Sequence, residues 1–138
     1  MHVQRTREIR VLIAARRSAL ASFHEALAGA GMRVVARCTS RRQVLAALAE
    51  ASPDVCVVER ELDGGGLVAA AAIAAPHPAP RVLLVGGHGS EAELRAARLA
   101  GAAGCLPGDV DASGLVTAVA ELAQATASGQ PQTRFDRR

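Results

Sequence analysis

The side chains that could perform chemistry in this sequence are few and widely separated. Three cysteines and four histidines occur, at Cys38, Cys56, Cys105, His2, His24, His77 and His88. Their spacing matches neither a zinc site nor a disulfide framework, and no nucleophile lies at a sensible spacing from a base. Cys56 and Cys105 fall within apolar runs, so we expect small buried hydrophobes in a reducing compartment. The sequence therefore predicts no enzyme activity, no metal and no cofactor.

Two glycine-rich runs offer a different chemistry, the binding of anions by backbone amides. These runs are Gly64–Gly66 and Gly86–Gly89. Glycine-rich turns at helix amino termini can bind phosphate or a small ligand. Alternatively, the glycines form plain turns, because Gly86-Gly87-His88-Gly89 matches no phosphate-loop fingerprint. Both interpretations stay open, and we expect the His88 side chain to be solvated.

The composition describes one protein domain without a strong preference for nucleic acid. The chain has 138 residues, half of them hydrophobic, and its only aromatic residues are two phenylalanines. Every basic side chain is an arginine, lysine is absent, and the net charge is +3. This charge is modest, so we expect nucleic-acid contact only through a fused or partner effector domain. Without a membrane-length apolar run or a signal-peptide core, the chain is expected to be cytoplasmic.

Apolar runs of strand length alternate with segments of helical periodicity, which indicates βαβ units and a parallel sheet. The expected strands are 9–14, 33–38, 55–58, 81–85 and a short one at 105–106. The expected helices are 18–28, one that follows Ser40, 67–75, 91–100 and 112–127. The pairs Ser40–Gln43 and Ser90–Glu93 have the spacing of helix capping boxes. The helix after Ser40 is expected to direct three side chains inward, those of Val44, Leu45 and Leu48.

Five strands and five helices in strict alternation predict an α/β fold. The expected architecture is a doubly wound, five-stranded parallel sheet of order 2-1-3-4-5, with helices on both faces. We expect one domain over residues 8–127 and flexible termini at 1–7 and 128–138. In such a sheet, ligand chemistry lies at the carboxyl ends of the first, third and fourth strands. Arg16 and Glu59 follow two neighbouring strands and are expected at this edge.

Three stretches resemble the receiver domain of bacterial response regulators, of the kind fused to helix-turn-helix regulators. They are Ile9-Arg10-Val11-Leu12-Ile13-Ala14, Ser52-Pro53-Asp54-Val55-Cys56-Val57-Val58 and Ala100-Gly101-Ala102-Ala103-Gly104-Cys105-Leu106. Their order and spacing carry the resemblance, which spans residues 8–127. It implies a CheY-like fold and a role in two-component signal transduction or transcription regulation.

The resemblance also identifies the positions of the family's phosphorylation machinery. In that family, two adjacent acids hold Mg²⁺, an aspartate accepts the phosphoryl group, and a hydroxyl residue and a lysine complete the site. An aromatic residue on the last strand acts as a switch. At these six positions this sequence has other residues: Ala15 and Arg16 for the acids, Glu59, Gly86, Gly108 and, at the switch, Cys105.

These substitutions remove what phosphoryl transfer requires. Mg²⁺ needs oxygen ligands, which Ala15 and Arg16 cannot supply. Phosphoryl transfer also needs metal and cationic stabilisation of the transferred oxygens. We therefore expect an atypical, phosphorylation-independent receiver. Arg16 and Glu59 either form a salt bridge that replaces metal and phosphate and fixes one conformation, or are solvated independently.

A module of this kind would act through protein contacts. The resemblance implies the face formed by the helix at 91–100, the strand at 105–106 and the helix at 112–127. Charges of both signs occur there, on Glu91, Arg95, Arg98 and Glu121. Such a face suits a homodimer or another protein partner, although it could also be merely solvated. Two further functions stay open: small-ligand binding at the glycine-rich crevice, and the regulatory half of a DNA-binding regulator whose effector domain is not in this chain.

Overall fold

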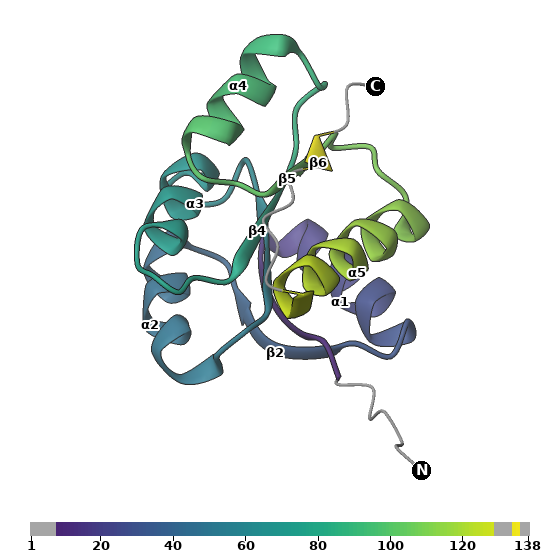
Figure 1. Cartoon of the computed structure of the whole chain (residues 1–138). Helices are drawn as coiled ribbons and strands as arrows, with labels where there is room; N and C mark the ends of the chain where they lie inside the picture. The colour runs from purple at the N-terminus through teal and green to yellow at the C-terminus, as the bar shows by residue number, and fades with distance from the viewer. Residues whose placement is uncertain (1–7, 129–133, 136–138) are drawn as a thin grey trace.

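The computed structural model describes residues 8–128 and 134–135, and strands and helices alternate in it from Arg10 onward (Figure 1). The strands are β1 (Arg10–Ala14), β2 (Arg33–Cys38), β3 (Val55–Glu59), β4 (Arg81–Val85), β5 (Gly104–Leu106) and β6 (Arg134–Phe135). The helices are α1 (Arg17–Gly29), α2 (Arg41–Ala51), α3 (Gly66–Ala74), α4 (Glu91–Leu99) and α5 (Ala112–Ser128).

The strands form one parallel sheet of order β2-β1-β3-β4-β5-β6. The first five strands confirm the predicted order, in which the chain reverses direction across the sheet after β2. Helices α1 and α5 cover one face, and α2, α3 and α4 cover the other (Figure 1). The register pairs Ala14 with Val58 and Glu59 with Val85, so β1, β3 and β4 end at a common edge.

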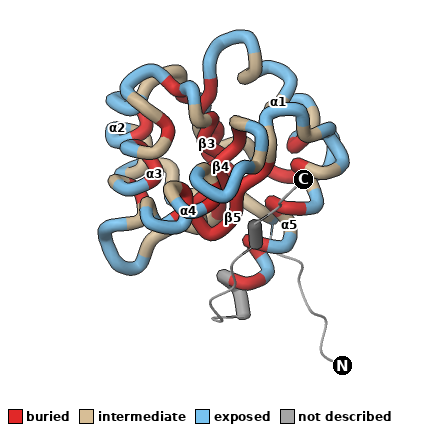
Figure 2. The backbone as a smooth tube through the Cα atoms, turned by 90° about the horizontal axis from the view of Figure 1, so that it is seen from above, coloured by how far each residue is buried: buried red, intermediate tan, exposed pale blue. Residues whose placement is uncertain are grey.

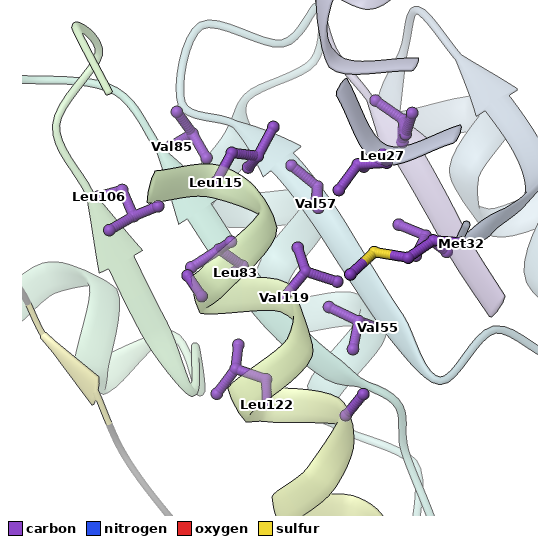
Figure 3. Packing of buried hydrophobic residues seen from close by; sticks show 14 of the residues in the cluster. Leu27, Met32, Val55, Val57, Leu83, Val85, Leu106, Leu115, Val119 and Leu122 are labelled. Atoms are coloured by element: carbon purple, nitrogen blue, oxygen red, sulfur yellow. The ribbon is translucent and has the colours of Figure 1, made fainter. Parts of the chain in front are cut away.

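The core consists of two layers because strand side chains alternate between the faces. Every residue of β3 is buried, as expected of a central strand covered on both sides. One layer packs strand residues such as Val55 and Val57 against Leu27 of α1 and Val119 of α5 (Figure 3). The other layer packs the intervening strand residues against α2, α3 and α4. All three cysteines are buried, which agrees with the prediction for Cys56 and Cys105.

Helix capping follows the sequence at one helix and departs from it at another. At α4, Ser90 and Glu93 form the reciprocal capping box. At α2, the Ser40 side chain accepts from the Gln43 amide, but Gln43 Oε1 accepts from the Thr39 amide rather than the Ser40 amide. The Gln43 side chain thus reaches one residue further back than a capping box requires.

The prediction that Leu45 points inward is wrong. Val44 is fully buried and Leu48 is half-buried, but Leu45 retains 46% of its exposure. An 11-residue amphipathic helix has room for only one narrow stripe against the sheet, and Val44 and Leu48 fill it.

A sixth strand extends the sheet at a place where the sequence predicted a flexible terminus. β6 pairs with β5 through Gly104 with Arg134 and Cys105 with Phe135. A two-residue strand is too short to produce a readable alternation, so the sequence pattern missed it. Residues 1–7, 129–133 and 136–138 of the predicted termini lie outside the described residues. Within the described ranges, no helix is both long and apolar enough to cross a membrane.

Candidate functional site

A crevice of about 900 Å³ opens at the carboxyl edge of the sheet. Its lining residues come from the segments that follow β1, β3, β4 and β5, together with the first turns of α1. Figure 2 shows β3, β4 and β5 side by side, with α1 next to them. Four of the predicted site positions line it with side chains or backbone, namely Arg16, Glu59, Gly86 and Gly108. The fold therefore brings together residues that are far apart in the sequence, as predicted from the strand order.

Arg16 and Glu59 form an ion pair at the centre of this edge. Arg16 Nη2 donates to Glu59 Oε2 at 2.8 Å, and Arg16 Nε donates to Oε1 at 3.0 Å. The Arg16 backbone amide also donates to Oε1, at 2.7 Å. The Glu59 side chain is 7% exposed, whereas that of Arg16 is 56% exposed. One residue therefore supplies three donors to a buried carboxylate and covers it from the solvent side.

Rigid backbone on both sides positions the pair. Glu59 ends a fully buried strand that is paired to β4. Ala15, which is completely buried, donates its amide to the Cys38 carbonyl and so continues the β1–β2 ladder past β1. Arg16 is the N-cap residue of α1, and its carbonyl accepts from the amides of Ala19 and Leu20. The amide that contacts Glu59 is therefore fixed by both a strand and a helix.

The pair determines the ionisation of Glu59. Burial raises the pKa of Glu59, but hydrogen bonds and the charge of Arg16 outweigh it and lower the pKa below its ordinary value. Hydrogen bonding to Glu59, followed by its charge, raises the pKa of Arg16. Glu59 is consequently ionised at neutral pH and is paired with Arg16 rather than solvated independently.

The residues at this edge do not fit the Mg²⁺ ion that the resemblance implies. Mg²⁺ requires oxygen ligands in near-octahedral geometry. Ala15 offers a buried methyl group, and both carboxylate oxygens of Glu59 already accept hydrogen bonds from Arg16. Within residues 8–128 and 134–135, no three acidic, histidine or cysteine side chains gather closely enough to hold a metal.

Gly86 and Gly108 have different local geometries. Gly86 has φ +144°, and a Cβ there would lie 2.7 Å from the Cβ of Arg60. A hydroxyl residue at this position would be strained and would collide with Arg60. A Cβ on Gly108 would lie no closer than 3.6 Å to its neighbours, which is ordinary contact. The backbone therefore requires glycine at 86 but accepts a side chain at 108.

Two donors of the second glycine-rich run, the amides of Gly86 and His88, are used within the protein. Glu93 Oε1 accepts from the backbone amides of His88 and Ser90, at 2.9 Å and 3.0 Å. These backbone hydrogen bonds, the one from Ser90 first, lower the pKa of Glu93. The Gly86 amide donates to the Leu106 carbonyl. The Glu93 carboxylate thus occupies the place that an external anion would take. Its capping-box spacing indicates the bond from the Ser90 amide but not the bond from the His88 amide.

Sequence reasoning did not assign three charged residues near the crevice to this site. Arg60 donates to the Glu93 carbonyl at 3.2 Å and so connects β3 to α4. Glu61 and Asp109 line the crevice and are exposed. No motif marks them, because each follows a strand without a periodic pattern. Their carboxylates make the rim acidic, which does not favour a phosphate ligand.

The remaining predicted positions lie away from the ion pair. Cys105 is buried in the core layer beneath α4, so its side chain faces other apolar groups instead of solvent. The predicted interface residues all lie exposed on α4 and α5, at Glu91, Arg95, Arg98 and Glu121. Leu99 at the end of α4 is 81% exposed and adds an apolar group to this face.

Comparison with known proteins identifies the family. The sequence matches the response regulator receiver domain over residues 11–120. The chain belongs to the response regulator receiver family. This membership confirms the resemblance to a receiver domain and assigns the domain to two-component signalling, where receivers are generally signalling modules and not enzymes.

Solved receiver structures agree with the assignment. The signal receiver domain of NarL from Mycobacterium tuberculosis is 27% identical, with a TM-score of 0.78 over 86% of this chain and 98% of that domain. A LuxR-family two-component response regulator from Aurantimonas is 25% identical, with a TM-score of 0.76 over 95% of this chain and 91% of that one. A CheY-like receiver from Methanospirillum hungatei, 18% identical with a TM-score of 0.79 over 89% of this chain and 99% of that chain, supports the fold alone. No curated protein sequence matches the chain.

Proposed function

We propose that this receiver domain acts in signal transduction or transcription regulation without phosphorylation of its acidic centre, as an atypical, cytoplasmic protein-interaction module. The observation that carries the proposal is the ion pair, in which both oxygens of Glu59 are bound by Arg16. A phosphoryl group could attach there only after the guanidinium had moved away. No Mg²⁺ ligand from Ala15 and no lysine would then stabilise the transferred oxygens.

The surface proposed for this role is the α4–β5–α5 face, used in a homodimer or with another protein. Its support is the exposure of Glu91, Arg95, Arg98 and Glu121, whose opposite charges could pair across a two-fold axis. The exposed Leu99 supplies the apolar contact that a charged face alone would lack. Any contact with nucleic acid would come through a fused or partner effector domain, as in the alternative of a DNA-binding regulator. The small-ligand alternative has less support, since Glu93 already binds the loop amides.

Phosphorylation chemistry is the direct test. The protein is incubated with acetyl phosphate and millimolar Mg²⁺, and its intact mass is measured. A receiver domain that retains the two acids, the aspartate and the lysine serves as the positive control. We expect the control to gain one phosphoryl group and this protein to gain none. A phosphoryl gain that disappears in Glu59→Gln would overturn the proposal.

A further inference from the structure

Helix α3 has an apolar surface that its position in the fold does not explain. Its sequence, Gly-Leu-Val-Ala-Ala-Ala-Ala-Ile-Ala, contains no polar side chain. A helix that is apolar all round is normally buried on every side. Here the side that faces the sheet is buried, at Ala69, Ala70 and Ile73, whereas Val68 and Ala71 are exposed to solvent.

Helix α2 continues this apolar surface. Leu45 on α2 and Val68 on α3 are 46% and 51% exposed, and both line a groove of about 610 Å³ between the two helices. Ala72 lines the same groove. The two helices lie next to each other on one face of the sheet (Figure 1), and their outward sides are exposed (Figure 2). Large aliphatic side chains from both helices therefore meet at one place on the surface.

Two arginines lie at the mouth of the groove, in a position that is unfavourable for positive charge. Arg41 and Arg42 occupy the first turn of α2, and both are exposed. The positive end of the helix dipole disfavours cations in a first turn. Asp63, which also lines the groove, offsets one of the two charges. Two exposed arginines at the positive end of a helix dipole are locally unfavourable, and a binding function explains such a placement.

We infer that the groove between α2 and α3, here called the α2–α3 groove, binds an amphipathic helix of a partner protein that carries acidic side chains. An apolar stripe at helical spacing would cover Leu45, Val68 and Ala72. Carboxylates beside this stripe would pair with Arg41 and Arg42 and would relieve their repulsion with the helix dipole. The inference rests on the proposed role as a protein-interaction module but uses a surface separate from the α4–β5–α5 face.

The groove is also joined to the centre of the domain. The segment between Glu59 and α3 forms its floor: the Arg41 amide donates to the Asp63 carbonyl at 2.8 Å. Gly64 has φ +91° and lies so close to Arg41 that a Cβ would come within 2.9 Å of the arginine Cβ. A partner in the groove therefore contacts the loop that begins at the ion pair.

The test uses synthetic peptides and the full chain. One peptide is a helix with leucines at i, i+4 and i+7 flanked by glutamates, and its partner peptide has lysines in place of the glutamates. Each is titrated into ¹⁵N-labelled protein, and amide shifts are mapped. We expect saturable shifts on α2 and α3 with the acidic peptide only, and weaker binding as the salt concentration rises.

Matched variants separate the groove from the other face. Leu45→Ser should weaken acidic-peptide binding about fivefold or more, and Arg41→Glu with Arg42→Glu should weaken it about tenfold or more. Leu99→Ser, an equivalent change on α4, should leave it unchanged. Circular dichroism and thermal melting of each variant report that the fold is intact.

Three outcomes would overturn the inference. They are equal binding of the two peptides, shifts confined to α4 and β5, and a self-association of this chain that Leu45→Ser abolishes, which would make a second copy the occupant. Shifts confined to α4 and β5 would leave the proposed function standing while removing the α2–α3 groove from it.

Discussion

Replacing Glu59 by glutamine tests the ion pair without changing the shape of the side chain. The glutamine oxygen can still accept from the Arg16 amide and Nε, whose donors lie 2.7 Å and 3.0 Å from Oε1. The new amide nitrogen would replace Oε2 and face Arg16 Nη2, which lies 2.8 Å away. Two donors would then meet, so one charge-assisted hydrogen bond is lost and the guanidinium must turn toward water.

The expected cost at neutral pH is about 1–2 kcal/mol in the free energy of unfolding. A hydrogen bond to a charged group contributes about 1.5–3 kcal/mol. Arg16 is 56% exposed, so solvent screening reduces this value. For a domain of this size the loss corresponds to a melting temperature lower by about 3–10 °C. Glu61→Gln, which changes an exposed glutamate two residues away, should stay within about 0.5 kcal/mol of the wild type.

The loss of stability caused by Glu59→Gln should become smaller as the pH falls. The pKa of Glu59 is lowered in the folded state from its ordinary value of 4.5. The unfolded chain therefore binds the proton more tightly, and the stabilisation is present above pH 4.5 and is lost as the pH falls through the folded pKa. Glu59→Gln lacks this contribution at every pH. The stability difference between wild type and variant should shrink in acid.

Urea unfolding of the three proteins at neutral pH and at a series of acidic values measures these differences. Other carboxylates, such as Glu93, are present in all three proteins, so their effect on stability cancels when the proteins are compared at the same pH. A gap between wild type and Glu59→Gln that is absent at neutral pH, or that is as large in acid as at neutral pH, would refute the pairing.

Three further predictions concern Mg²⁺ binding, the two glycines of the crevice and the α4–β5–α5 face. Millimolar Mg²⁺ should leave the melting temperature unchanged, because a ligand that stabilises the fold must bind it; a saturable rise abolished by Glu59→Gln would contradict this. Gly86→Ser should lower the free energy of unfolding by about 1–3 kcal/mol because of its φ of +144° and the Arg60 contact, whereas Gly108→Lys should change it by about 0.5 kcal/mol or less; equal losses in urea unfolding would be inconsistent with the two geometries. Arg95→Glu and Arg98→Glu, tested separately, should each weaken self-association or partner binding in sedimentation experiments while melting as the wild type does, and unchanged association in both would exclude the α4–β5–α5 face.

The fold was readable from the sequence because its main signals are strong. β-branched runs bounded by glycine and proline marked the strands, and β2 and β4 have the bounds that the sequence predicted. The strand order alone predicts that Arg16 lies beside Glu59, because β1 and β3 are neighbours in the sheet. β6 was missed because two residues carry no period.

Side-chain detail at the site was less accessible. Leu45 has the hydrophobicity of a core residue, and only the packing around Val44 and Leu48 leaves it at the surface. The second use of Glu93, as the acceptor for the His88 amide, depends on a loop conformation set by glycines with positive φ. Loop conformations of this kind produce no periodic pattern or fixed spacing of residues, so the sequence does not reveal them.

The central claim is that an internal ion pair occupies the position of metal and phosphate in this receiver. Its most direct test is the amide spectrum of the ¹⁵N-labelled protein with and without acetyl phosphate and millimolar Mg²⁺. We predict unchanged positions for the amides of Arg16, Glu59 and Gly87, and for those of α4 and β5. A second set of peaks at these residues that grows with the phosphodonor and is absent in Glu59→Gln would contradict the claim.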